Sequence, residues 1–343
     1  MKLSELINSA LSDREIIGIT CDSREVKPGY LFACINGPER DGHDFAASAL
    51  EKGAAAILCE RDLGFDNQII VENTKHIYPA ICQQWYGNAA SKLKLIGVTG
   101  TNGKTSITYL IKNMLENMGS KCGLIGTIQN ICGDKIFESK NTTPSIENLH
   151  RYFSYMVEEG CEYCVMEVSS HALEQERVFG LEFETAIFTN LTQDHLDYHK
   201  TMENYLAAKK KLFYNCKNAV INIDDRYAAE LMRGLGCNIL TYSINDNTSD
   251  FQAKNIRYTR SGNDFELLSN GVISRVSLNI PGKFSVYNAL AAGACGICLG
   301  FSIEGITQSL SKAKGIKGRA EVVPTDTDYS VIIDYAHTPD GIA

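Results

Sequence analysis

The sequence predicts an α/β protein in which a small N-terminal α/β domain precedes a larger domain built on a mostly parallel sheet with helices on both faces. Three observations carry this prediction. Short apolar runs alternate with amphipathic segments, a glycine-rich turn joins one apolar run to a helix-like segment, and polar residues follow several of the runs. Repeated β–α alternation is typical of parallel sheets, which bind ligands at the carboxyl ends of their strands.

The N-terminal domain is expected to occupy residues 1–90. Its strand candidates are the short apolar runs IIGIT, AAAILCE and QIIVEN. A longer β–α series begins at Leu93, so the central domain is expected to span residues 91–324. Its predicted strands are Leu93 to Val98, CGLIGTI, YCVMEVSS, TAIFTNLT and NAVINID, and its first predicted helices are 105–118, 145–159 and 202–213.

The last third of the chain changes character. From Phe251 to Ile280 apolar and polar residues alternate without a helical pattern, which predicts an antiparallel hairpin that turns at Asn270-Gly271. Helices are predicted again at 285–299 and 303–314. The chain then ends in YSVIIDYAHTPDGIA, a strand followed by a turn, so residues 325–343 are expected to be the start of a truncated third domain.

The turn GTNGKT, between the first central strand and its helix, has the composition of a phosphate-binding loop. Gly100 and Gly103 permit unusual backbone conformations, and N–H groups before a helix N-terminus attract anions. Lys104 would contact the outer phosphates and Thr105 would bind Mg²⁺. The strict motif has a glycine where Val98 stands, so this is a shorter variant, and a purely structural turn is the alternative. ATP is the predicted ligand of this P-loop ATPase-like domain.

Polar clusters follow three predicted strands. They are Glu167 with Ser169, Ser170 and His171; Asp194, His195, Asp197 and His199; and Asp334 with His337. A carboxylate on a strand beside the phosphate loop can reach the Mg²⁺ of bound ATP, which favours Glu167 for that role. Three alternatives stay open: a solvated Glu167, a zinc site in DHLDYH, and interior hydrogen-bonding roles for His171 and His199.

Bulk properties exclude several classes of protein. The formal net charge of −8 argues against a nucleic-acid partner. No run reaches the roughly 18 apolar residues that span a bilayer, and the N-terminus lacks a signal-peptide core, so a cytoplasmic protein without membrane insertion is expected. The 12 cysteines lie mostly in apolar contexts, which favours buried free thiols; a zinc site from the pairs Cys161/Cys164 and Cys295/Cys298 is the alternative.

Eight motifs then occur in one order along nearly the whole chain. They are CDSREVKPGYLFACINGPERDGHDF, GTNGKT, EVSSHALEQERV, FTNLTQDHLDYH, YLAAKKKLF, GKFSVYNALAA, KGRAE and DYAHTPDG. Together they resemble the Mur ligase family. The resemblance implies an ATP-dependent ligase of peptidoglycan synthesis that adds the third amino acid to UDP-MurNAc-L-Ala-D-Glu through an acyl phosphate. The alternatives are another Mur-type ligase, a folylpolyglutamate-synthase-like enzyme, and a nucleotide-binding module without ligase activity.

The resemblance also implies cofactors and site residues. ATP, two Mg²⁺ ions and a carbamylated Lys209 are expected, because a lysine shielded from water can lose its proton and react with CO₂. Without the resemblance, Lys209 reads as one of three solvated lysines on a helix. The implied catalytic residues are Lys104, Lys209 and His195. The implied metal ligands are Thr105, Glu167, His195 and Lys209. The implied nucleotide-binding residues are Gly100, Thr101, Asn102, Gly103, Lys104, Thr105, Asn288, Arg319 and Asp334.

The implied ligands of the UDP-MurNAc-dipeptide are Ser23, His43, Asn141, Thr142, Thr143, Ser169, Gln175 and Arg177. A free amino acid would be the other substrate, and L-lysine and meso-diaminopimelate both remain open. Its pocket would lie in a Rossmann-like third domain that the chain largely lacks, so a chain that binds ATP and UDP-substrate without completing catalysis is an open alternative. A monomer is expected.

Overall fold

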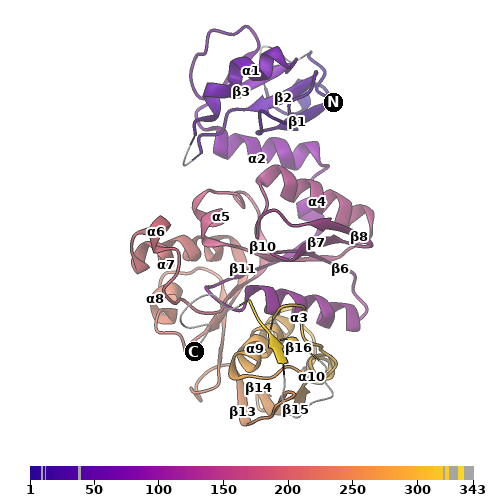
Figure 1. The fold of residues 1–343 in the computed structure, drawn as a ribbon, viewed down its shortest axis with the longest axis vertical. Coiled ribbons are helices and arrows are strands. Elements are labelled where there is room, and N and C mark those ends of the chain that lie inside the picture. Colours follow the sequence, from indigo (N-terminus) through magenta and orange to yellow (C-terminus); the bar gives the residue numbers. More distant parts are fainter. Residues whose placement is uncertain (9–10, 12, 38–39, 320, 324–330, 336–343) are drawn as a thin grey trace. The chain divides into compact units, whose positions relative to one another are not determined.

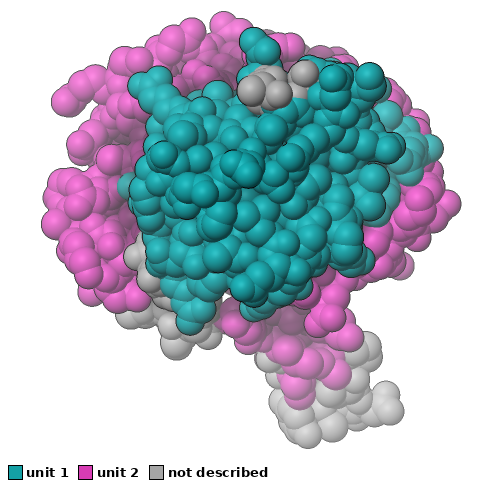
Figure 2. Space-filling view, turned by 90° about the horizontal axis from the view of Figure 1, so that it is seen from above, with its two compact units in different colours: residues 1–92, 144–158, 174–181 teal, residues 93–143, 159–173, 182–343 magenta. Residues whose placement is uncertain are grey.

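Figure 1 shows the fold in a computed structural model of residues 1–343. The structure describes the whole chain except residues 9–10, 12, 38–39, 320, 324–330 and 336–343. Two compact units are formed (Figure 2). The N-terminal unit comprises Met1–Lys92, Pro144–Glu158 and Glu174–Leu181, and the other described residues form the central unit.

The N-terminal unit contains a four-stranded parallel sheet in the order β1-β2-β3-β4. Its strands are β1 (Gly18–Thr20), β2 (Tyr30–Ala33), β3 (Ala56–Cys59) and β4 (Gln68–Ile70), and its helices include α1 (Ala46–Glu51) and α2 (Thr74–Trp85). The three predicted strands are confirmed as β1, β3 and β4. Strand β2 was not predicted, because a buried strand of four residues shows no alternation that separates it from a loop.

Helix α4 (Ile146–Glu158) packs with the N-terminal unit, although its sequence position had placed it in the central series. A buried carboxylate contributes to this packing. Glu147 Oε2 accepts hydrogen bonds from the Tyr78 hydroxyl at 2.9 Å and from the Cys21 N–H at 3.3 Å. Burial raises the pKa of the Glu147 carboxyl, and the bond from Tyr78 opposes that rise. Helix α4 therefore packs in this unit through the hydrogen-bonded carboxylate of Glu147 as well as through its apolar face.

The central unit is built on an 11-stranded sheet in the order β15-β14-β13-β12-β11-β10-β5-β9-β6-β7-β8. Every pairing from β13 to β6 is parallel, which confirms the predicted mostly parallel sheet. These strands are β5 (Lys94–Thr99), β6 (Cys122–Ile125), β9 (Tyr163–Glu167), β10 (Phe183–Phe188), β11 (Cys216–Asn222), β12 (Asn238–Ser243) and β13 (Phe251–Tyr258).

Helices cover both faces of this sheet. Ile96 and Val98 of β5 share one core with the helices α3 (Lys104–Asn117), α9 (Lys283–Cys298) and α10 (Ile303–Ser311), which are grouped together in Figure 1. Gly97 points to the opposite face, where an added Cβ would meet Phe183 and Leu212. Alternate residues of a buried strand therefore face different layers, as expected for period-two geometry. The remaining helices are α5 (Ser170–Glu174), α6 (Leu196–His199), α7 (Met202–Lys210) and α8 (Ala228–Met232).

Two hairpins extend the sheet. Strands β14 (Asn263–Ser269) and β15 (Val272–Leu278) turn at Asn270-Gly271, both with positive φ, as a tight primed turn requires. This hairpin was predicted. The hairpin of β7 (Gln129–Cys132) and β8 (Lys135–Glu138) was not.

The C-terminal part described contains β16 (Glu321–Val323) paired with β17 (Val331–Ile333), after which Asp334 is exposed. His337 lies outside the described residues. All twelve cysteines are free thiols and most are buried. Among the helices that the structure describes, none has the length and apolar character needed to cross a membrane.

Candidate active site

The glycine-rich loop runs from the end of β5 to the start of α3. Gly103 has φ 90°, which favours glycine, and an added Cβ would approach Asn288 Oδ1 to 2.7 Å. A Cβ on Gly100 would overlap Thr189 Oγ1. The two glycines are therefore fixed by backbone conformation and by close approach of neighbouring side chains. The loop backbone leads directly into the N-terminus of α3, an arrangement that suits an anion.

The segment after β10 holds this loop in place. The Asn102 N–H donates to Asn190 Oδ1 at 2.9 Å, and Thr189 Oγ1 donates to the Asn102 carbonyl at 2.6 Å. Asp225 Oδ2 in turn accepts from the Leu191 N–H at 2.8 Å. These supporting residues were not predicted from the sequence. The only available signal was their position directly after predicted strands.

Lys104 lies folded onto the loop that precedes it. Its Nζ donates to the carbonyls of Gly100 at 2.9 Å and Thr101 at 2.8 Å. Burial lowers the pKa of the Lys104 ammonium, while the nearby charges of Glu167 and Asp194 oppose that change. The cation is therefore placed among carbonyls and carboxylates beside the loop.

Glu167, the last residue of β9, is only 1% exposed. Its Oε2 accepts from Thr105 Oγ1 and from Thr127 Oγ1, each at 3.0 Å, and its Oε1 accepts from the Thr127 N–H at 2.8 Å. Arg319 Nη2 lies 3.4 Å from Thr105 Oγ1. The alternative of a solvated glutamate is wrong, because the carboxylate is buried and joined to the first turn of α3.

Lys209, on α7, is also 1% exposed, whereas Lys211 is exposed. Its Nζ donates to the Gly100 carbonyl at 2.9 Å and lies 4.4 Å from the centre of the Tyr205 ring. Burial and then the charge of Lys104 lower the pKa of Lys209 well below its usual value. The interpretation of Lys209 as a solvated lysine is therefore wrong.

His195 precedes α6 with φ 52° and is held by Asp194. The His195 N–H donates to Asp194 Oδ1 at 2.8 Å, and its ring packs edge-on against His171 at 4.7 Å. Burial lowers the pKa of His195, and Asp194 opposes this shift. His199 is buried, with Nε2 2.9 Å from Ser170 Oγ, as the interior alternative expected. Over the described residues, no group of three or more His, Cys, Asp or Glu side chains is arranged to hold a metal ion.

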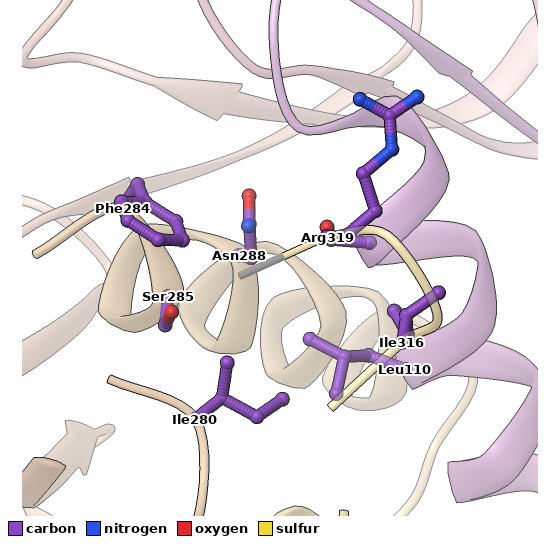
Figure 3. Close-up of a pocket in the computed structure, with 8 residues that line it drawn as sticks. Leu110, Ile280, Phe284, Ser285, Asn288, Ile316 and Arg319 are labelled. Atoms are coloured by element: carbon purple, nitrogen blue, oxygen red, sulfur yellow. The ribbon is translucent and has the colours of Figure 1, made fainter. Parts of the chain in front are cut away.

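A small pocket lies beside α3 and α9 (Figure 3). Its lining residues are Ser106, Leu110, Ile280, Phe284, Ser285, Asn288, Ile316 and Arg319. The surface of the pocket is mainly apolar although four of its eight lining residues are polar, and the polar groups of Asn288 and Arg319 point in the same direction in Figure 3. Because Asn288 also lies against Gly103, the pocket is adjacent to the glycine-rich loop.

Known proteins show the same combination of elements. Residues 98–296 match the model of the Mur ligase middle domain, and residues 15–89 match that of the Mur ligase family catalytic domain. The chain belongs to the Mur ligase family. This Mur ligase is 47% identical over 333 residues to a UDP-N-acetylmuramoyl-L-alanyl-D-glutamate--2,6-diaminopimelate ligase of Clostridium acetobutylicum, a match that covers 96% of the chain and 69% of the relative.

A Bacillus cereus ligase with the same substrates in its name is also 47% identical, over 338 residues, covering 96% of the chain and 69% of that relative. A solved structure of such a diaminopimelate ligase superposes with a TM-score of 0.85 at 32% identity, over all of this chain and 72% of the other. MurF from Thermotoga maritima in complex with ADP, at 20% identity and a TM-score of 0.64, covers 96% of this chain and 73% of its own and shares the fold. The family resemblance and fold class predicted from the sequence are thus confirmed.

Three of the expected substrate residues of this Mur ligase gather at the end of β9. Thr143 Oγ1 donates to the Glu167 carbonyl at 2.8 Å and accepts from the Ser169 N–H at 3.0 Å. Thr142 Oγ1 lies 3.1 Å from Thr127 Oγ1. Asn141 precedes them and is exposed.

The other expected substrate residues belong to the N-terminal unit. Gln175 Oε1 accepts from Arg177 Nε at 3.1 Å and Nη2 at 2.6 Å. The Ser23 carbonyl accepts from Lys52 Nζ. His43 is buried, and both ring nitrogens are engaged: Nδ1 is 2.5 Å from Asp41 Oδ1, and Nε2 accepts from the Glu60 N–H at 2.9 Å. Its imidazole therefore fixes local structure.

Proposed function

We propose that this Mur ligase uses ATP to join 2,6-diaminopimelate to UDP-MurNAc-L-Ala-D-Glu. The observation that carries the proposal is the bond between the buried Glu167 carboxylate and Thr105, at the first turn after the phosphate loop, in a chain 47% identical to a ligase named for these substrates. A carboxylate at this position suits a metal-bound triphosphate.

The nucleotide would be bound by the loop and the pocket beside it. Loop N–H groups of residues 100–105 would face the phosphates, with the α3 dipole favouring their negative charge. Lys104 has a flexible stem and can exchange the Gly100 and Thr101 carbonyls for phosphate oxygens. The adenine would lie against Phe284 and Asn288 in the mainly apolar pocket. Arg319 and Asp334 would complete the nucleotide contacts.

Two Mg²⁺ ions would be held by Thr105, Glu167, His195 and a carbamate on Lys209. The residues fit this role, because Glu167 is a buried carboxylate whose hydroxyl partners can rotate, and oxygen ligands are those Mg²⁺ prefers. Bound magnesium neutralises charge on the phosphoryl oxygens.

The burial of Lys209 supports a carbamate on its side-chain nitrogen. The lowered pKa of Lys209 favours its uncharged amine, whose lone pair would form an N–C bond to CO₂ while the nitrogen gives one proton to solvent, which leaves an anionic carbamate. That anion would lie beside the Lys104 ammonium, whose charge already acts on Lys209.

The reaction would proceed in two steps. The side-chain carboxylate of D-Glu attacks the γ-phosphorus of ATP, an O–P bond forms, and ADP leaves. The amine of diaminopimelate then attacks the acyl phosphate, phosphate leaves with the C–O bond electrons, and the amine loses a proton. Lys104 and the loop amides would stabilise charge on the transferring group. Thr142, Thr143, Ser169, Gln175 and Arg177 would hold the muramyl dipeptide, and Ser23 and His43 would support the uridine end.

Positional isotope exchange tests the first step. The chain is incubated with Mg²⁺ and ATP carrying ¹⁸O in the β–γ bridge, with or without UDP-MurNAc-L-Ala-D-Glu. Scrambling of the label is expected only with the dipeptide substrate, and UDP-MurNAc-L-Ala, which lacks the accepting glutamate, is the matched control. Formation of UDP-MurNAc-tripeptide after addition of meso-diaminopimelate, followed by mass spectrometry, tests the second step. Nucleotide binding without any dipeptide-dependent exchange would refute the proposal.

A further inference from the structure

The turn Gly126-Thr127, directly after β6, contacts the proposed metal carboxylate, which also accepts a hydrogen bond from Thr105 at the start of α3. A Cβ on Gly126 would overlap Glu167 Oε1, so only glycine leaves room for the carboxylate here. The Gly126 N–H donates to Oδ1 of the buried Asn130 at 3.3 Å. The backbone of this turn is thereby held so that the Thr127 N–H donates to Glu167 Oε1 at 2.8 Å.

The Thr127 side chain lies between two groups with different proposed tasks. Its Oγ1 is 3.0 Å from Glu167 Oε2 and 3.1 Å from Thr142 Oγ1. A carboxylate only accepts hydrogen bonds, so the single hydroxyl proton of Thr127 is donated to Glu167. The Thr142 hydroxyl then donates to Thr127. The structure thus contains a directed chain from Thr142 through Thr127 to the carboxylate.

We propose that Thr127 is a positioning residue that couples the metal carboxylate to the loop Asn141–Thr143, which the proposed function assigns to the muramyl dipeptide. The inference rests on that function. A substrate oxygen that accepts the Thr142 proton withdraws it from Thr127, which changes the restraint on Glu167. A cation on Glu167 displaces the Thr127 hydroxyl and frees it toward Thr142. Coupling between two binding sites is reciprocal.

Thr127 is exposed, so its hydroxyl can be removed without opening a core cavity. Thr143 offers a contrast, because it is buried and bonds the backbone carbonyl of Glu167. A change at Thr143 would displace the strand end itself. A substitution at Thr127 therefore tests coupling through the carboxylate without disturbing the fold.

The test uses the full chain and three variants: Thr127→Val, which keeps the shape and removes the hydroxyl; Thr127→Ser, which keeps the hydroxyl; and Thr142→Val. Calorimetry measures the Kd of UDP-MurNAc-L-Ala-D-Glu with and without Mg²⁺ and a non-hydrolysable ATP analogue. In the wild type the two Kd values should differ by about fivefold or more. The ratio of the two Kd values should approach one in Thr127→Val and return to the wild-type value in Thr127→Ser. It should also fall in Thr142→Val, and the double variant Thr127→Val/Thr142→Val should show no further change.

Two results would overturn the inference in distinguishable ways. If Thr127→Val keeps the wild-type ratio of Kd values and the effects of the two substitutions are additive in the double variant, Thr127 does not take part in the coupling. The proposed function is unaffected by that result. A wild type that binds the magnesium nucleotide but no UDP-dipeptide removes the proposed function, and the coupling with it. Thermal unfolding of the metal-free variants should match the wild type, which excludes a general structural effect.

Discussion

The buried pair of Tyr78 and Glu147 gives a quantitative test of how α4 is held in the N-terminal unit. The Tyr78 side chain is fully buried, and its hydroxyl donates to Glu147 Oε2 at 2.9 Å. Tyr78→Phe removes this donor and leaves that oxygen with the longer bond from the Cys21 N–H. A hydrogen bond to a charged group contributes about 1.5–3 kcal/mol, so we expect a loss of roughly 2 kcal/mol in the free energy of unfolding at pH 7.

The cost of Tyr78→Phe should depend on pH. Burial raises the folded-state pKa of Glu147 and the Tyr78 hydroxyl lowers it, so removing the hydroxyl raises that pKa further. A carboxyl group whose pKa is raised by folding stabilises the folded state fully at pH values below its unfolded-state pKa of 4.5. This stabilisation is lost as the pH increases through the folded-state pKa. The substitution should therefore cost less at pH 4.5 than at pH 7, and Glu147→Gln should remove this difference.

The assay is urea unfolding followed by fluorescence of the single tryptophan, Trp85, which lies on α2 in the same unit as Tyr78. A double-mutant cycle of Tyr78→Phe and Glu147→Gln isolates the pairwise contribution. Glu158→Gln, at an exposed carboxylate of the same helix, is the control. Additive single changes, or a cost of Tyr78→Phe below about 0.5 kcal/mol at both pH values, would refute the reasoning.

Four further predictions concern the active site. Lys104→Ala should reduce dipeptide-dependent isotope exchange by on the order of 100-fold, and unchanged exchange would contradict its role at the phosphates. Lys209→Ala should lower turnover by a similar factor. The turnover of the wild type should fall in CO₂-free buffer and recover when bicarbonate is added, and a turnover that does not depend on CO₂ would argue against the carbamate. Gly103→Ala, strained at φ 90° and crowded by Asn288, should cost about 1–3 kcal/mol of unfolding free energy by calorimetry, whereas an unchanged midpoint would show that the loop relaxes. Asp225→Ala should raise the Kd for ATP about fivefold, near the 1 kcal/mol of one lost hydrogen bond, and an unchanged Kd would mean that Leu191 needs no such anchor.

Local signals in the sequence pointed to part of the candidate site. The loop GTNGKT and Glu167 were found because a phosphate loop needs glycines at fixed positions and because a strand end can be located from an apolar run. Thr127, Asn190 and Asp225 carry no such signal. Each acts through hydrogen bonds to residues distant in sequence, and single polar residues after strands are too common to single out.

The sequence by itself determined the β–α series, the glycine-rich turn GTNGKT between a strand and a helix, and the hairpin at Asn270-Gly271, because periodicity and turn conformation depend on neighbouring residues. Only the tertiary structure decided that α4 folds with the N-terminal unit and that Lys209 is buried against Tyr205 and Gly100. An amphipathic helix shows that one face is covered, but its pattern does not say by what. Likewise the charge state of a lysine depends on the groups that enclose it, and those are brought together only by folding.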